Sequence, residues 1–177
     1  RGRGSFAFAA LALAAAPLSA ATWHVDSARP DDSGDGTSWA TAERTIQAAV
    51  SASAAGDAIL VTNGVYGPIS TANKAIAIAS VEGPESTTID GGDMARCATL
   101  GGELPPRRTL LAGFTLRNGV AEEGGGAFGG TLSNCVLVAN SATEAGGGAY
   151  GSTLHRCTVA DNVAYGGGGA ASCDIAD

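Results

Sequence analysis

Oxygen-bearing side chains near the start of the chain have the spacing of a calcium loop. Asp31, Ser33 and Asp35 alternate and are followed by Gly36, as in the first half of a loop whose carboxylate and hydroxyl oxygens bind Ca²⁺. The twelfth position, where such a loop carries a bidentate glutamate, is Ala42. The segment is either a calcium site or an Asp/Gly turn, and the missing glutamate favours the turn.

Two glutamates at equivalent points of a sequence repeat are a second candidate for calcium. They are Glu122 and Glu144, with Glu123 beside the first. Equivalent side chains of stacked repeats lie above one another, and carboxylates that close repel unless a cation lies between them. The alternative, which we favour, is that both side chains extend into water.

A histidine and an aspartate form the remaining pair with acid and base chemistry. His155 and Asp161 can exchange protons only if the intervening turn brings them together. The strand positions predicted to face outward beside them carry plain side chains: Val136, Val138, Thr158 and Ala160. We therefore predict no catalytic residue in this chain, and no cofactor other than calcium at the acidic residues above.

A sequence repeat must position these residues. The following pairs are all separated by the same step along the chain: Gly124 and Gly146, Leu132 and Leu154, Cys135 and Cys157, Asn140 and Asn162. A fixed step of roughly 20–50 residues is typical of stacked architectures. Short apolar runs alternate with predicted turns at the glycine runs and at 140–142, and no long helix follows Phe114. We therefore predict an all-β solenoid, a right-handed parallel β-helix.

The apolar residues set the register of the coils. The predicted inward positions, coil by coil, are Phe114 and Leu116, Cys135 and Leu137, and Cys157 and Val159. The step from Phe114 to Cys135 is one residue shorter than the step from Asn118 to Asn140. A slip of one residue reverses which side chains face inward. We adopt the apolar register, in which Asn140 stacks on Asn162 as an amide ladder.

The cysteines of an exported protein invite a disulfide interpretation. The chain has four: Cys97, Cys135, Cys157 and Cys173. Cys135 and Cys157 share an inward position on adjacent coils, but in-register neighbours on parallel strands rarely reach the torsion of a disulfide. Bridged and buried-thiol states both remain open, and we favour buried thiols. The chain has no CxxC motif, so zinc is not predicted.

An amphipathic helix is predicted before the first coil, within residues 41–55. Ile46, Ala49, Val50 and Ser53 have the spacing of one helix face, and Gly56 is a natural helix end. Such a helix covers the open apolar end of a solenoid. We assign 22–56 to an N-terminal segment with this cap helix and 57–177 to truncated β-helix coils. Early strands are predicted at 57–61, 75–78, 87–89 and 110–116.

Residues 1–21 have the organisation of a signal peptide. Arg1 and Arg3 precede an eleven-residue apolar run that begins at Phe6, and small residues continue to Ala21. The run is shorter than the roughly 20 residues of a membrane span. Cleavage would export the remainder to the extracellular space or outer surface. It would also change the net charge from −7 to −9, with 8 basic and 17 acidic residues left, which argues against nucleic acid as a partner.

Motifs along the chain resemble the opening of bacterial right-handed parallel β-helix repeat proteins of the pectin-lyase-like superfamily. They are WHVD at 23–26, DGTSWATA at 35–42, TIQAA at 45–49, GDAILV at 56–61, GVY at 64–66, IDGG at 89–92 and GFTLRNG at 113–119. GGAY at 147–150 and LVAN at 137–140 are similar to the repeats of polymorphic outer-membrane proteins. The resemblance implies the fold but not one function, because the superfamily holds lyases, hydrolases, epimerases and non-catalytic surface proteins.

Two functions follow from these observations. The first is a non-catalytic, exported β-helix protein, adhesin-like or carbohydrate-contacting, whose partner is a polysaccharide or a host or cell-surface ligand. The alternative is a secreted polysaccharide lyase or hydrolase with catalytic coils beyond Asp177. A lyase of this fold needs clustered carboxylates for Ca²⁺ and an arginine or lysine base. The charges of these coils are scattered, which favours the first function.

Overall fold

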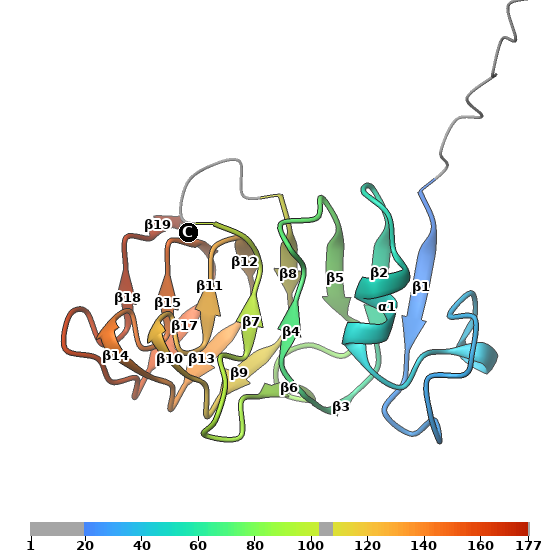
Figure 1. Ribbon diagram of the computed structural model, residues 1–177, viewed down its shortest axis with the longest axis horizontal. Coiled ribbons are helices and arrows are strands. Elements are labelled where there is room, and N and C mark those ends of the chain that lie inside the picture. The colour runs from blue at the N-terminus through green and yellow to red at the C-terminus, as the bar shows by residue number, and fades with distance from the viewer. Residues whose placement is uncertain (1–19, 103–107, 177) are drawn as a thin grey trace, which may run out of the picture.

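The computed structural model of this protein describes residues 20–102 and 108–176. Most of the predicted signal peptide, residues 1–19, lies outside this part of the chain. The described strands form four sheets, and every strand pairing recorded among them is parallel. In Figure 1 the strands stand side by side along the long axis of the molecule, from β1 at one end to β18 at the other.

The strands of each sheet are arranged in chain order. Sheet A contains β1 (Thr22–Val25), β2 (Ala58–Val61), β5 (Ala77–Ser80), β8 (Leu110–Ala112), β12 (Thr131–Ser133), β16 (Thr153–His155) and β19 (Asp174–Ala176). Sheet B contains β3 (Gly64–Tyr66), β6 (Thr87–Asp90), β9 (Thr115–Arg117), β13 (Val136–Val138) and β17 (Thr158–Ala160). Sheet C contains β4 (Ile69–Ser70), β7 (Ala98–Thr99), β11 (Ala127–Phe128), β15 (Ala149–Tyr150) and β18 (Ala170–Ala171). Sheet D contains β10 (Val120–Glu123) and β14 (Ser141–Ala145).

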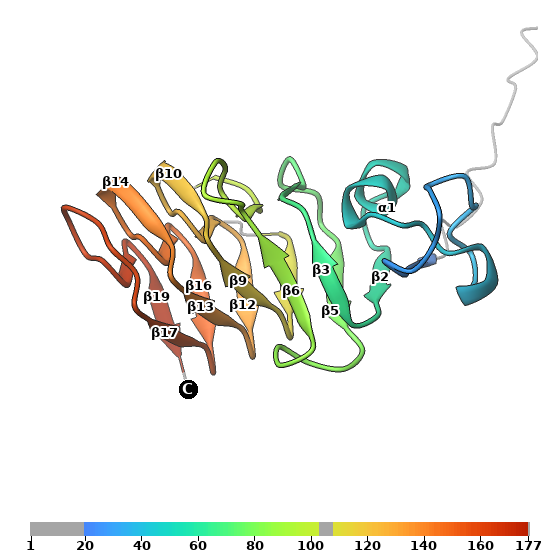
Figure 2. The same cartoon turned by 90° about the horizontal axis from the view of Figure 1, so that it is seen from below.

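This order makes the chain an all-β solenoid of parallel sheets. From β2 to β18, each circuit of the chain adds one strand to sheet A and one each to sheets B and C, whereas β1 is followed by η1 and α1. Figure 2 shows these circuits side by side from below. The predicted strand at 110–116 is divided into β8 and β9 by a corner at Gly113, which has a positive φ of 77°. The strand predicted at 75–78 lies two residues later, as β5.

The apolar register is confirmed. Leu137 of β13 pairs with Leu116 of β9 on one side and with Val159 of β17 on the other. Asn118 follows the pair of Arg117 with Val138, so it lies opposite Ala139 rather than Asn140. Asn118 and Ala139 both have φ 54° and occupy the same corner, which removes Asn118 from the asparagine stack.

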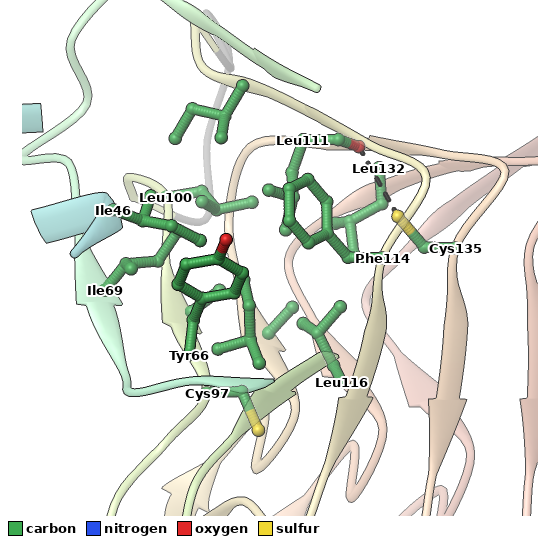
Figure 3. Close-up of a cluster of buried hydrophobic side chains, with 14 of the residues drawn as sticks. Ile46, Tyr66, Ile69, Cys97, Leu100, Leu111, Phe114, Leu116, Leu132 and Cys135 are labelled. Atoms are coloured by element: carbon green, nitrogen blue, oxygen red, sulfur yellow. Dashed lines mark hydrogen bonds between the residues drawn. The ribbon is translucent and has the colours of Figure 1, made fainter. Parts of the chain in front are cut away.

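A continuous apolar core fills the coils. One inward row runs along sheet A through Ile59, Ile78, Leu111, Leu132 and Leu154, each at most 2% exposed. Figure 3 shows two members of this row, Leu111 and Leu132, beside Phe114, and shows the ring of Tyr66 near Ile69. Each such side chain contributes about 1.5–3 kcal/mol by leaving water. No unit of the stack encloses its own row, so the coils depend on their neighbours.

The asparagine ladder is confirmed at the corner before sheet D. The Asn140 Nδ2 group donates to the carbonyl oxygen of Leu116 at 2.9 Å and to Asn162 Oδ1 at 3.0 Å. Its Oδ1 atom accepts the backbone N–H of Gly119 at 2.9 Å. The Asn162 Nδ2 group in turn donates to the carbonyl oxygen of Leu137 at 2.8 Å. Each amide therefore joins its own coil to the preceding one.

The glycine runs form tight corners, as predicted. Gly124, Gly146 and Gly167 have φ of 59°, 63° and 60°, a region that side chains disfavour. At Gly126 the constraint is space, because a Cβ atom there would overlap the carbonyl oxygen of Gly148. The turn predicted at 140–142 is wrong in part, since Ser141 and the following residue belong to β14.

The predicted helix is present but shorter than 41–55. It is α1 (Ile46–Ala52), preceded by the 3₁₀ turn η1 (Trp39–Thr41). The Thr45 hydroxyl accepts the N–H of Ala48 at 3.2 Å and begins the helix, and Ser53 is extended. The four residues predicted for one helix face are all buried: Ile46, Ala49, Val50 and Ser53. The helix contacts β1, β2 and β4 (Figure 1). No described helix has the length and apolar character to cross a membrane.

Candidate functional site

The first predicted calcium residues form hydrogen-bonded turns. Asp31 Oδ1 accepts the N–H of Ser33 at 3.0 Å, and Asp35 Oδ1 accepts the hydroxyl of Thr41 at 2.6 Å and the N–H of Thr37 at 3.0 Å. The bond from Thr41, followed by those from Thr37, lowers the pKa of Asp35 to about 2. Among the described residues, no three His, Cys, Asp or Glu side chains gather as a metal site. Calcium binding here stays a prediction.

The second predicted pair lies on neighbouring strands rather than at a corner. Glu122 belongs to β10 and Glu144 to β14, and both are exposed. The register between these strands shifts between Ala121 and Glu123, so Glu122 lies opposite a bulged segment that includes Glu144. Both side chains are exposed on sheet D, and calcium binding at this pair also stays a prediction.

The predicted acid and base lie on different sheets. His155 is the last residue of β16 in sheet A. Asp161 follows β17 of sheet B at a corner, where its φ is 53°. Over the residues that the structure describes, no hydrogen bond joins the two side chains.

A polar cluster on the outer face of sheet B has its charges paired. The Nε atom of Arg117 donates to Asp90 Oδ2 at 2.9 Å, and Asn118 Nδ2 donates to the same carboxylate at 3.1 Å. The N–H of Gly92 also donates to it at 2.9 Å. The bonds from Arg117 and Asn118 to Asp90 join two neighbouring coils. Because the carboxylate and the guanidinium neutralise each other, we assign the cluster a structural role rather than a reactive one.

An aromatic pair lies on the outer face of sheet C, at the centre of a row along the solenoid axis. In-register pairing places these outward residues in order: Ser70, Thr99, Phe128, Tyr150 and Ala171. The rings of Phe128 and Tyr150 stack with centroids 5.8 Å apart and an interplanar angle of 12°. Both side chains are half-buried. The row thus carries two hydroxyls, then two rings, then a methyl group.

Arg96 completes this row as a cation over the first ring. Its guanidinium carbon lies 4.7 Å from the centroid of Phe128. The side chain is fixed by donation to the carbonyl oxygens of Glu123 at 2.7 Å and Gly124 at 2.9 Å, and to the hydroxyl of Thr99 at 3.2 Å. Partial burial lowers the pKa of Arg96, but guanidinium groups keep their charge in proteins. We call Arg96, Phe128 and Tyr150 the aromatic column.

The aromatic column has the chemistry of a stacking platform. The guanidinium of Arg96 lies over the ring of Phe128, and the ring of Tyr150 in the next coil stacks with the same ring. The next residue in the row is Ala171, whose methyl group is too small to cover the far face of Tyr150. The electron-rich face of an aromatic ring attracts C–H groups and cations. Phe128 and Tyr150 are separated by the same step along the chain as Leu132 and Leu154, and this repeat is the sequence signal that aligns the two rings.

Comparison with known proteins identifies no relative. No protein-family model matches the chain, and neither a curated protein nor a solved structure matches it.

Proposed function

We propose that this protein is a non-catalytic, exported, adhesin-like solenoid that contacts carbohydrate through the aromatic column on sheet C. The observation that supports this function is the fixed stack of Arg96, Phe128 and Tyr150 on an outward-facing row. A pyranose ring has one face of C–H groups, and such a face packs against an aromatic ring whose far side is open.

The rest of the row supplies polar partners for the same ligand. Thr99 and Ser70 continue the row from Phe128 on the side away from Tyr150. Rows along the axis repeat at the coil spacing of about 4.8 Å, so a linear sugar chain laid along sheet C meets stacking and hydrogen-bonding groups in succession. Rigid strands hold these groups without an ordering cost on binding.

The proposed function includes the hand of the coil, a capping role for α1 and export of the protein. We propose that the coil is right-handed, in accord with the resemblance to the pectin-lyase-like superfamily and the hand of nearly all parallel crossovers. Helix α1 acts as the N-terminal cap: Gln47 Oε1 accepts the N–H of Ser70 at 2.8 Å, beside edge strand β4. Export rests on the predicted signal peptide, and N-terminal sequencing of secreted protein beginning near Ala21 tests it.

The experiment is sedimentation with a panel of insoluble neutral and acidic polysaccharides. We expect the purified protein to co-sediment with at least one of them. The variant Tyr150→Ala should lose about tenfold in affinity, since a ring contact contributes about 1–1.5 kcal/mol. The matched control is Tyr165→Ala, which removes a tyrosine that is 98% exposed and outside the column.

Enzymatic activity is measured on the same samples. The proposal predicts that no new reducing ends and no unsaturated products appear during incubation. Depolymerisation abolished by one Asp or Glu substitution would overturn the non-catalytic proposal in favour of the lyase or hydrolase alternative. Equal binding by Tyr150→Ala and the unaltered protein, or no binding to any polysaccharide, would overturn the carbohydrate site.

A further inference from the structure

The outward face of sheet A carries a patch of apolar side chains. Strands β2, β5 and β8 are consecutive neighbours in this sheet and lie side by side in Figure 1. On each strand, two residues flank the member of the inward row, and they point outward because successive side chains alternate between the two faces. These outward residues are all alanine or leucine, and all are half-buried: Ala58, Leu60, Ala77, Ala79, Leu110 and Ala112. Leu60 and Leu110 lie outside the buried core cluster, so they form apolar surface.

This face carries no Asp, Glu, Lys or Arg between β1 and β16. The outward residues on the other strands of that span are threonine, serine or histidine: Thr22, His24, Thr131, Ser133, Thr153 and His155. The chain as a whole has a net charge of −7, so two copies repel each other on average. Sheet A is therefore a face on which two copies can meet without bringing acidic side chains together.

The two leucines of the patch stand at opposite corners of a regular grid. Strand pairing arranges the six side chains in two rows along the axis: Ala58, Ala77 and Leu110 in one, and Leu60, Ala79 and Ala112 in the other. A two-fold axis along β5 would place β2 of one copy over β8 of a second copy. Leu60 then lies over Ala112 of the partner subunit, and Leu110 lies over Ala58 of the partner subunit. Large side chains thus meet small ones, as the interdigitation of two packed layers requires.

The charges of the N-terminal segment select this axis over the other one in the plane of the sheet. A two-fold axis along the solenoid also sets each leucine over an alanine, but it brings the two N-terminal segments side by side. Residues 20–45 hold more acidic than basic side chains: Asp26, Asp31, Asp32, Asp35 and Glu43 against Arg29 and Arg44. The axis along β5 directs these segments to opposite ends of the pair, where they do not repel each other.

The size of the face indicates a weak association. Beyond β1 the face is extended by Trp39, which is 42% exposed and contacts the ring of His24 with centroids 4.5 Å apart. An overlap centred on β5 therefore runs from Trp39 to β16. At a strand spacing of about 4.8 Å and a width of about 13 Å, this overlap covers roughly 400 Å² on each copy. A stable dimer buries about 800 Å² on each partner.

We propose that this protein forms a weak dimer in which sheet A of one copy packs on sheet A of a second copy, with the two solenoids running in opposite directions about a two-fold axis along β5. The two sheets pack face to face about 10 Å apart, as in aligned sheet packings. The interface consists of the leucine and alanine grid at its centre, with hydroxyl and imidazole groups at its margins.

The experiment is sedimentation equilibrium of the purified protein at concentrations up to about 1 mM, because an interface of this size is weak. The four cysteines are free thiols, so a reducing agent excludes dimers linked by disulfides. We expect the average mass to rise toward that of a dimer as the concentration increases. The control is Val65→Ala, which shortens a 61% exposed side chain on sheet B and should associate like the unaltered protein.

Two single variants and their combination test which residues face each other. Leu60→Ala leaves a void over Ala112 of the partner subunit, and Ala112→Leu sets two leucines against each other. Each should weaken association by at least about tenfold. The combination of Leu60→Ala with Ala112→Leu places large over small again, so it should associate within about threefold of the unaltered protein. Circular dichroism of each variant confirms folding.

Three results would overturn the proposal. A monomer at every concentration would show that the face binds no second copy, and weaker co-sedimentation of Leu60→Ala with a polysaccharide would then assign the face to that ligand. Unchanged association of Leu60→Ala would place the interface elsewhere. A combined variant that associates no better than Ala112→Leu alone would exclude the axis along β5, because the axis along the solenoid sets position 112 against Leu110.

Discussion

The N-terminal and C-terminal regions of the solenoid are built in different ways. In sheet A, one register position of the first four strands is occupied by Thr22, Ala58, Ala77 and Leu110. The steps between these residues are unequal. The same position continues through Leu110, Thr131, Thr153 and Asp174, and these steps differ by at most one residue. The first region therefore has corners of different lengths, whereas the second repeats one corner set with little change.

Individually placed side chains hold the irregular region. Asp57 alone accepts bonds from the N–H groups of Ala21 and Ala54 and from the indole N–H of Trp23. The hydrogen bond from the N–H of Ala54 makes the largest contribution to lowering the pKa of Asp57. Lys74 donates to three carbonyl oxygens near the end of α1, including that of Ser53 at 2.8 Å. The contacts of Asp57 and Lys74 are local and do not recur from coil to coil.

Shared positions hold the repeated region. Asn140 and Asn162 each donate from Nδ2 to the carbonyl oxygen of a leucine in the preceding coil, and the glycine corners at Gly124, Gly146 and Gly167 have nearly the same φ. A change at one repeated position therefore disturbs the coils on both sides, while a change in the irregular region disturbs one local contact.

The largest effect is expected at a repeated glycine. Gly126→Ala places a Cβ atom against the carbonyl oxygen of Gly148 and the amide of Asn140, so neighbouring coils must separate. We expect a loss of about 3 kcal/mol or more in the free energy of unfolding, measured with urea. Gly67→Ala is the control, because a Cβ there meets nothing within 4 Å, and it should change stability by less than about 0.5 kcal/mol.

Removing one rung of the amide ladder is expected to rank second. Asn140→Ala leaves the carbonyl oxygen of Leu116 and the N–H of Gly119 without this partner in a buried site. The cost is about 2–3 kcal/mol in urea unfolding. Asn134→Gly, at an exposed corner with φ 50°, is the matched control and should be close to neutral. Equal losses in both variants would contradict the ladder's role.

The irregular region should respond locally. Lys74→Met removes the donor to the carbonyl oxygens of Val50, Ser51 and Ser53. We expect a loss of about 1–2 kcal/mol, with faster amide hydrogen exchange confined to α1. Arg44→Met, which removes an exposed bond to Pro30, is the control. Faster exchange throughout 110–176 would show that the two regions unfold as one.

The smallest effect concerns a buried carboxyl of the irregular region. Glu43 is 7% exposed, and its Oε2 atom has no hydrogen-bond partner. Burial, with smaller contributions from Asp32 and Asp35, raises its pKa. The folded state therefore binds this proton more tightly than the unfolded state, and stability falls as pH rises from the unfolded pKa through the folded one.

Glu43→Gln removes this titration. We expect the variant to melt at a higher temperature than the unaltered protein at pH 7, with the difference shrinking toward pH 4. Thermal melts at several pH values measure this, with Glu82→Gln, an exposed glutamate, as the control. A constant difference at all pH values would mean that the carboxyl of Glu43 is not responsible.

The sequence predicts the repeated region better than the irregular one, because the repeated region is built from positions that recur and the irregular one from single contacts. Leu137 and Asn140 are assigned correctly because their equivalents recur at a fixed step. The predicted helix is too long because its limits depend on single contacts: Thr45 begins it, and Lys74, distant in the chain, binds its end. Such long-range partners leave no periodic signal.

Within the aromatic column, too, the sequence aligns only the residues that belong to the repeat. Phe128 and Tyr150 are one repeat apart, so their alignment follows from sequence. Arg96 precedes Thr99, which aligns with Phe128 across a longer step than that from Phe128 to Tyr150, outside the repeat. Its place over the ring depends on the path of an irregular coil, which the sequence pattern does not specify.

The most direct test of the proposed function is an experimental structure of the protein with an oligosaccharide of the polysaccharide that it binds best. We predict a sugar ring against the face of Tyr150 directed toward Ala171, with the sugar chain running along sheet C. A sugar bound elsewhere, with the aromatic column unoccupied at saturating ligand, would contradict it.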